Sequence, residues 1–285
     1  MEHVNGEMNV NLLDHTKDAA RVLVFSKRTR HSVNAASYEE AMNMSEDELK
    51  NELKYVFSTI GSSWEFVDYT FLITGVTRAF THQLVRHRVG VAFAQQAMRV
   101  GEQLDFGYMV PTDFCFDFDS ENAKSNENPE DRRKQLLYGS YVNCMDSIQS
   151  HYVELIENNA RPQDARGVLP TNILTNILFK VNLRALADIM NVRLCLRAQG
   201  EFQEVARKMQ QLVLGVHPWA AQILGPNCLV HSVCKFPRYT ECPISQKHPQ
   251  LRGLPEDTKN AIRSDWEGLV GYDPQPVAND WDLSR

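Results

Sequence analysis

Seven arginines border the apolar segments of this 285-residue sequence, and their side chains are the strongest candidates for chemistry: Arg86, Arg88, Arg99, Arg166, Arg184, Arg193 and Arg197. An arginine beside a buried segment needs a carboxylate or an anionic ligand, because an unpaired charge in an apolar site is very costly. Few acids lie nearby in the sequence: Glu102, Asp105, Asp164 and Asp188. Guanidinium groups bind phosphate through paired hydrogen bonds, so the group predicts a phosphate-bearing ligand. For any single arginine, a structural ion pair is an equally good interpretation.

Motifs of several common enzyme classes are missing from the sequence. It has no G-x-G-x-x-G opening a helix and no G-x-x-x-x-G-K-[ST], which argues against a Rossmann dinucleotide site and a P-loop. It has no G-x-S-x-G and no cysteine with an obvious helper histidine. Cys195 lies between Arg193 and Arg197, which would lower its thiol pKa, but a small buried apolar role fits it equally.

A late cluster contains metal-binding residue types. Its members, Cys228, His231, Cys234 and Cys242, have the spacing C-x2-H-x2-C-x7-C. Zinc prefers four such ligands in a tetrahedron, but this spacing matches no common zinc finger. The alternative is a tail of reduced thiols and no metal.

Bulk composition limits the partners of the protein. The formal net charge of -6 gives no reason to expect binding to nucleic acid or to an anionic membrane. No apolar run approaches the roughly 18 residues of a membrane helix, and residues 1–10 lack the pattern of a signal peptide. We therefore expect a cytoplasmic protein.

Hydrophobic periodicity and turn residues predict a mixture of helices and strands. Helices are expected over 37–61, 77–88, 133–159 and 201–224, the last broken near Pro218, and a new element begins at Pro162. Strands are expected over 64–76 and 106–111, and 18–27 fits either a helical turn or a strand. Residues 171–194 are apolar and should be buried, whereas 1–16, 119–132 and the tail from 225 should be irregular.

Several ordered blocks resemble the flavin-dependent thymidylate synthase family. The family signature opens with Arg-His-Arg, here residues 86–88, and closes with an arginine, here Arg99. Further blocks are ARGVLP (165–170) and VNLRALADIMNVRLCLRAQGEFQEVA (181–206), with weaker matches at AAR (19–21), WEF (64–66) and HPW (217–219). The tail from Gly225 is similar to a cysteine-bearing tail in longer family members, and the resemblance spans about residues 18–243.

The resemblance implies an α+β subunit with central helices and a small, mostly antiparallel sheet. A catalytic domain would occupy residues 1–243, and an irregular C-terminal extension would occupy 244–285. The family implies a homotetramer with FAD bound between subunits. Its reaction transfers a one-carbon unit from methylenetetrahydrofolate to C5 of a uridine nucleotide, with hydride from flavin reduced by NADPH. No enzyme cysteine adds to the pyrimidine, so the missing nucleophile motif is expected.

Residue roles follow from the same resemblance. Arg193 and Arg86 would be catalytic, with Arg193 stabilising negative charge on O4 of the uracil. The nucleotide would be bound by Gln83, Arg86, Gln96, Ala97, Arg99, Arg166 and Arg193. The flavin would be lined by Arg86, His87, Arg88, Asn182, Arg184, Asp188 and Arg197, with Glu65 and Thr70 as further candidates.

The signature departs from the family pattern in its second half. Serines of the pattern fall on Ala92 and Ala97, its Asn-Glu pair falls on Ala94 and Gln95, and its final tyrosine is Val100. A histidine of the family is replaced by Phe66. Three functions therefore remain open: thymidylate synthesis from dUMP, a specialised C5 modification such as UMP methylation or hydroxymethylation, and nucleotide or flavin binding without catalysis.

Overall fold

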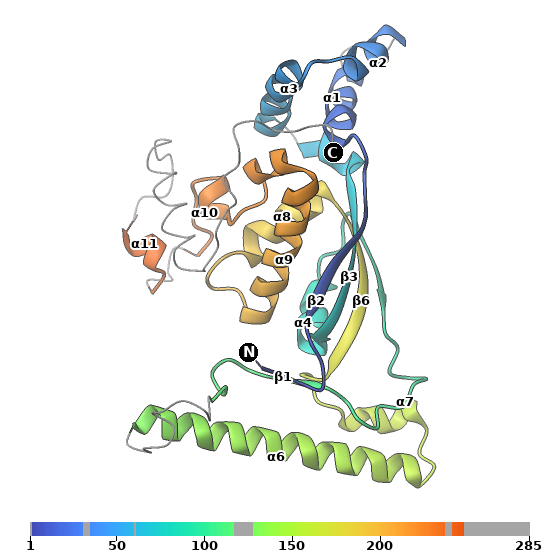
Figure 1. Ribbon diagram of the computed structural model, residues 1–285, viewed down its shortest axis with the longest axis vertical. Coiled ribbons are helices and arrows are strands. Elements are labelled where there is room, and N and C mark those ends of the chain that lie inside the picture. The colour runs from blue at the N-terminus through green and yellow to red at the C-terminus, as the bar shows by residue number, and fades with distance from the viewer. Residues whose placement is uncertain (1, 31–34, 60, 117–127, 237–240, 248–285) are drawn as a thin grey trace. The chain divides into compact units, whose positions relative to one another are not determined.

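The computed structural model describes residues 2–30, 35–59, 61–116, 128–236 and 241–247 (Figure 1). It confirms a mixed α and β fold with small antiparallel sheets. The chain divides into two compact units, each built from segments far apart in the sequence. Unit 1 contains residues 1–10, 72–86 and 93–179, and unit 2 contains 11–71, 87–92 and 180–285.

A four-stranded sheet has the order β2-β3-β6-β4. Its strands are β2 (Asn9–His15), β3 (Asp68–Thr77), β6 (Leu174–Asn182) and β4 (Val91–Gln95). β3 and β6 run antiparallel, because the Arg78 N–H donates to Ile173 O (3.1 Å) and the Leu183 N–H donates to Val67 O (2.7 Å). Alternate residues of both strands are buried, as the period of two in a strand requires.

Unit 1 holds a second, two-stranded sheet and the longest helix. β1 (Glu2–Val4) pairs antiparallel with β5 (Tyr108–Val110). Helix α6 (Pro129–Glu157) begins at Asn128, whose side chain accepts from the Glu130 N–H, and it contacts β5 and α7 (Pro162–Ala165). A core forms between these elements, and its buried members are Met98, Phe106, Tyr108, Val110, Met145 and Ile173. The remaining elements of unit 1 are α4 (Arg78–Leu84) and the short η2 (Arg166–Val168).

Unit 2 is mainly helical. α1 (Ala19–Thr29), α2 (Ala35–Met42) and α3 (Glu46–Ser58) are neighbours in sequence, and α1 packs against both of the others. η1 (Gly61–Phe66) packs against α8 (Leu183–Arg193), and α8 packs against α9 (Gly200–Val216). The tail contains η3 (Pro218–Gln222), α10 (Asn227–Val230) and α11 (Pro243–Lys247).

Most expected helices are confirmed, with several changes of boundary. The helix expected over 37–61 is divided, because Ser45 forms a capping box with Glu48 and begins α3 anew. Pro218 ends α9 as expected, and Pro162 is the first residue of α7. The loop expected over 119–132 ends sooner, since α6 starts at Pro129; residues 117–127 lie outside the described residues.

Two expectations of irregular segments are corrected, and the segment expected to be buried is assigned its elements. Residues 1–16 were expected to be loose but contain β1 and β2, because the backbone of β1 pairs with β5 and that of β2 with β3. The buried segment 171–194 contains both β6 and α8. The tail from 225 forms two short helices within its described part, and 248–285 lies outside the described residues. The boundary proposed at 243/244 falls inside α11 and remains a prediction.

Candidate functional site

The signature tripeptide lies between helix α4 and strand β4. Thr77 caps α4 through a hydrogen bond from the Phe80 N–H to its hydroxyl (3.0 Å), and the helix ends at Leu84. Arg86 follows in a turn, held by its N–H to Gln83 O (3.3 Å). Arg86 and Arg88 are exposed, whereas His87 is half-buried. The division into units falls between Arg86 and His87, so the candidate residues are described as two groups.

Two arginines of unit 1 lie close together without an acid. Burial, and then the charge of Arg166, lower the pKa of Arg78, although a guanidinium remains protonated at any ordinary pH. In the described part of the chain, neither Arg78 nor Arg166 forms an ion pair. Two adjacent cations without a carboxylate form a site that favours an anion.

Arg78 is absent from the candidates that the sequence identified, although the same criterion applies to it. The window TGVTRAFTH, residues 74–82, contains an arginine beside an apolar segment and contains no acid. The backbone of Arg78 is fixed at the start of α4. The Arg78 N–H donates to Ile173 O, and Arg78 O accepts from the Thr81 hydroxyl (3.1 Å). Gln95 on β4 donates in turn to Thr81 Oγ1 (2.9 Å).

The remaining residues of unit 1 that are expected to bind the nucleotide differ in exposure and in hydrogen bonding. Gln96 is exposed but bound to β6, because its N–H donates to Asn176 O (2.9 Å) and its Oε1 accepts from Asn176 Nδ2 (3.3 Å). Ala97 and Arg99 are exposed, and Gln83 is half-buried at the end of α4. Among the described residues, Arg86 and Arg99 form no ion pair, so both cations remain available to a ligand.

Two of the substituted signature positions, Ala92 and Ala94, share one side of β4. Ala92 and Ala94 are exposed, and they alternate with the half-buried Val91, Phe93 and Gln95. Phe93 stacks on Phe179 at 5.2 Å between ring centroids, which holds the other side of the strand. The two alanines therefore present methyl groups to solvent, where the family pattern has groups able to hydrogen-bond.

His87 and Arg193 belong to one group in unit 2, joined by Phe202. The Arg193 guanidinium lies 4.2 Å from the centre of the Phe202 ring, and His87 meets that ring edge-on at 6.3 Å. Burial and the charge of Arg193 lower the pKa of His87, against an opposing effect of Asp188, so the imidazole is neutral at pH 7. Burial also lowers the pKa of Arg193.

The His87 ring carries an unused polar atom. Nε2 is buried and has no hydrogen-bond partner among the described residues. A buried nitrogen without a partner costs about 1–3 kcal/mol, which a ligand with a polar edge would recover. The group therefore offers a neutral imidazole, a guanidinium over an aromatic ring, and a nearby carboxylate at Asp188.

Three other flavin candidates are engaged within the protein. Arg184 and Glu65 form an ion pair with 2.6 Å between Nη1 and Oε1, and both are exposed. Asn182 caps α8 by accepting from the Ala185 N–H (2.9 Å). Gly90 packs on this cap: its φ is 70°, and a Cβ there would lie 2.4 Å from Asn182 Nδ2. The Asn182 side chain thus has a structural role that the sequence did not predict.

The last flavin candidates are less closely connected to this group. Thr70 is a half-buried residue of β3. Arg88 is exposed and forms no ion pair within the described part of the chain. Arg197 is exposed, and its guanidinium lies 4.8 Å from the centre of the Phe236 ring.

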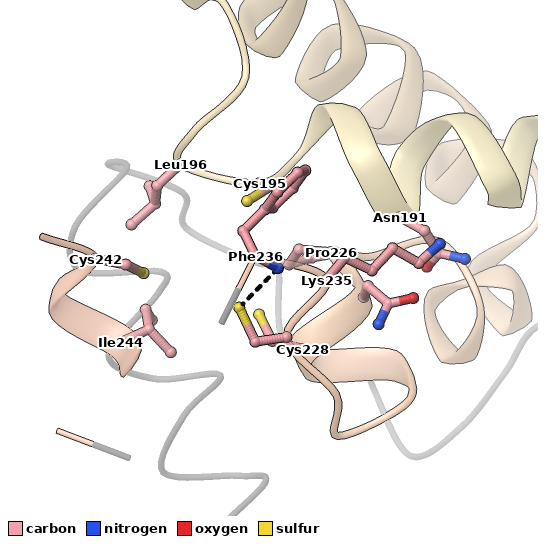
Figure 2. A pocket seen from close by; sticks show the side chains of 11 residues that line it. Asn191, Cys195, Leu196, Pro226, Cys228, Lys235, Phe236, Cys242 and Ile244 are labelled. Carbon is pink, nitrogen blue, oxygen red and sulfur yellow. Dashed lines mark hydrogen bonds between the residues drawn. The ribbon is translucent and has the colours of Figure 1, made fainter. Parts of the chain in front are cut away.

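The metal-ligand set expected from the tail spacing is corrected. His231 Nε2 lies 3.3 Å from Asn191 Nδ2, and His231 does not line the cavity that the cysteines share. Cys228, Cys234 and Cys242 line that cavity together with Cys195, which the spacing argument did not include (Figure 2). Among the described residues, no three histidine, cysteine or acidic side chains are arranged as metal ligands.

Comparison with known proteins identifies the family of the chain. The model of a family described as "Thymidylate synthase complementing protein" matches residues 11–219. A flavin-dependent thymidylate synthase of Sulfurisphaera tokodaii is 31% identical over 225 residues, covering 79% of this chain and 80% of its own. Its counterpart in Pyrococcus furiosus is 35% identical over 178 residues, covering 60% and 66%. The chain belongs to the flavin-dependent thymidylate synthase family, a family of methyltransferase-type enzymes, as its signature predicted.

A solved structure shows the same fold. The UMP/dUMP methylase PolB from Streptomyces cacaoi, bound with 5-Br dUMP, superposes with a TM-score of 0.59 and covers 76% of this chain and 93% of its own. Its sequence identity is 20%. In the described part of this chain, no helix combines the length and the hydropathy that crossing a membrane requires.

Proposed function

We propose that this protein methylates C5 of a uridine nucleotide, dUMP or UMP, with methylenetetrahydrofolate as the one-carbon donor. The observation that carries the proposal is that Arg78 and Arg166, which lie near enough for the charge of Arg166 to lower the pKa of Arg78, form no ion pair in the described part of the chain. A nucleotide phosphate would neutralise both. Membership of the family and the retained Arg86, His87 and Arg88 support the same substrate class.

Arg193 would act on the uracil. Its guanidinium is partly desolvated and held over Phe202, so it donates from a fixed position. Negative charge develops on O4 when C5 acts as a nucleophile, and a fixed cation at O4 stabilises that charge more in the transition state than in the ground state. Arg86 would add positive charge toward the nucleotide from the end of α4.

The residues of unit 2 fit a flavin. The buried His87 Nε2 would bind a polar edge of the ring system, and Arg88, Arg184 and Arg197 would contact its anionic parts. FAD, reduced by NADPH, supplies the hydride when it is bound. Asn182 would position the flavin loop indirectly, through its contact with Gly90, rather than by direct contact.

A second candidate is a specialised C5 modification, either UMP methylation or hydroxymethylation. The exposed methyl groups of Ala92, Ala94 and Ala97 favour it, because they stand where the family pattern has hydrogen-bonding side chains. Loss of one net hydrogen bond costs about 1 kcal/mol, which changes substrate preference without abolishing catalysis. A binding protein without catalysis is disfavoured by the retained Arg193 and Arg166.

We also propose that the chain assembles as a homotetramer with flavin sites between subunits. Of the 29 residues of α6, Met145 and Tyr152 are buried, and Leu136 on this helix is 69% exposed. Such a helix offers apolar area to another copy. Light scattering of the purified chain measures the assembly directly, and a monomer at micromolar concentration would contradict it.

One experiment tests the function. The purified protein is examined for a flavin absorption spectrum, then incubated with dUMP or UMP, methylenetetrahydrofolate and NADPH, and the nucleotide is analysed by mass spectrometry. A methyl group on either nucleotide is the expected product. A hydroxymethyl product would support the second candidate, and a protein that takes up no FAD would overturn both.

A further inference from the structure

Helix α8 carries a polar stripe formed by Arg184, Asp188 and Asn191. These residues follow one another at intervals of four and three, which places them on one face of the helix. Arg184 and Asp188, the two that are expected to line the flavin, are exposed. Asn191 is buried, so another segment of the chain covers this end of the stripe.

The covering segment belongs to the tail. Helix α10 packs against α8, and Asn191 lines a cavity together with Lys235 and Phe236 of the tail (Figure 2). His231, which directly follows α10, has its Nε2 atom 3.3 Å from Asn191 Nδ2. The tail segment 227–236 therefore borders the polar stripe of α8 at its C-terminal end.

His231 also lies near the acid that acts on the signature histidine. Burial lowers the pKa of both His231 and His87, and the charge of Asp188 opposes that effect in each case. Interactions between charges fall off within roughly 10 Å in salt solution. Asp188 is therefore near one imidazole of the signature and one of the tail.

Phe236 makes a second contact between the tail and a flavin candidate. The centre of its ring lies 4.8 Å from the Arg197 guanidinium, within the range of a cation–π interaction. The backbone of the loop that carries Arg197 is held separately, because the Ala198 N–H (2.9 Å) and Gln203 Nε2 (3.0 Å) both donate to Cys195 O. An exposed arginine side chain has many rotamers, and an aromatic ring against it restricts the orientation of the guanidinium.

We propose that the tail segment 227–236 forms one wall of the candidate flavin site, where Phe236 positions the Arg197 guanidinium for an anionic part of the flavin. The inference rests on the proposed function, because Arg197 is a flavin residue only under that proposal. Phe236 would be a positioning residue that acts through Arg197, and His231 would support the wall from Asn191. The match to the family model ends at residue 219, so this wall lies outside the matched range.

Packing of the tail on α8 without any role in flavin binding is the alternative. The two roles differ in how Phe236 and Arg197 combine. If the ring positions the guanidinium, removal of the ring weakens flavin binding only while the arginine is present. If the ring only packs, its removal has the same effect on flavin binding with or without the arginine. A double-mutant cycle separates the two cases.

The FAD affinity of the full-length protein, freed of cofactor and measured by fluorescence titration, tests the proposal. Phe236→Leu should weaken FAD binding about two- to fivefold, as expected for an exposed cation–π pair, and Phe236→Tyr should retain the wild-type affinity. In the Arg197→Ala background, Phe236→Leu should have no further effect. Tyr55→Leu is the matched control, because it removes the ring of another cation–π pair of unit 2, with Lys27 at 4.1 Å, and it should bind FAD as the wild type does.

Equal FAD affinity of Phe236→Leu and the wild type would overturn the proposal, and so would an equal loss in both backgrounds. Hydrogen–deuterium exchange of the wild-type chain gives a second measurement that requires no variant to fold. FAD should slow the exchange of amides in 227–236 as well as those in α8. Slower exchange in α8 alone would overturn the wall and leave the proposed function intact.

The outcomes also separate this inference from the proposed methylation. A wild-type protein that binds FAD and protects 227–236, but methylates no nucleotide, would support the wall and overturn the methylation. A wild-type protein that takes up no FAD would overturn both.

Discussion

The two units contain arginines that differ in whether an acidic side chain pairs with them. In unit 2, Arg184 forms an ion pair with Glu65, and Arg28 on α1 pairs with Glu40 and Glu52. In unit 1, the charge of Arg166 lowers the pKa of Arg78, and neither arginine forms an ion pair in the described part of the chain. An acidic partner neutralises the charge of an arginine within the protein. Two neighbouring arginines without such a partner repel each other, which disfavours the folded state.

The difference separates structural cations from those kept for a ligand. Repulsion between the half-buried Arg78 and the exposed Arg166 costs free energy, and a bound anion would offset that cost. Within unit 2, the Arg193 guanidinium lies over the Phe202 ring, 4.2 Å from its centre. The candidate site is therefore distinguished by which arginines have an acidic partner, more than by where the arginines lie.

The largest effect is expected from Arg193→Ala. If this guanidinium stabilises charge on the uracil, kcat should fall roughly 10²- to 10³-fold. The flavin spectrum should be unchanged, which reports that the protein has folded. Lys180→Ala is the control, because Lys180 is exposed and pairs with Asp68 at 2.9 Å. Normal turnover in the Arg193 variant would remove the catalytic assignment.

Arg78→Ala tests the unpaired arginines of unit 1 directly. Loss of a charge-assisted contact to phosphate should raise KM for the nucleotide about 100-fold, with a smaller change in kcat. Arg133→Ala is the matched control, because Arg133 belongs to the same unit but pairs with Glu130 (2.9 Å) and Asp113 (3.1 Å). Equal KM values for the two variants would break the distinction between paired and unpaired arginines.

Gly90→Ala tests whether the close contact between Gly90 and the Asn182 side chain stabilises unit 2. A side chain at φ 70° is strained and would meet the Asn182 amide, so the free energy of unfolding should fall by about 2 kcal/mol. Gly139→Ala on α6 is the control, since nothing lies within 4 Å of its Cβ position, and helix propensity should make it neutral or stabilising. Denaturant titration measures both variants. Equal stability would contradict the contact.

The smallest effect is expected from Arg184→Ala. An exposed ion pair contributes less than about 1 kcal/mol to stability, so the unfolding midpoint should barely move. The proposed flavin contact nevertheless predicts a loss of about tenfold in FAD affinity, measured by fluorescence titration. If Arg184→Ala binds FAD as tightly as Arg28→Ala, whose lost arginine is also acid-paired, Arg184 is a structural cation only.

Local patterns predicted the helices better than the strands. The apolar stripe of α9 and the proline that ends it lie within one segment, and both predictions are confirmed. β2 and β4 were not predicted, because a short strand depends on its neighbour in the sheet for its hydrogen bonds. The division between α2 and α3 could have been found from the S-x-x-E sequence at Ser45.

By itself, the sequence determined the family, through motifs in which a few neighbouring residues carry the chemistry, such as Arg86, His87 and Arg88. It also determined which signature positions lost their polar groups. Only the tertiary structure decided that the charge of Arg166 acts on Arg78, that Phe202 joins His87 to Arg193, and that Cys195 shares a cavity with three cysteines of the tail. The physical reason is that charge, burial and ligand geometry depend on distances across the fold, and spacing along the chain does not encode those distances.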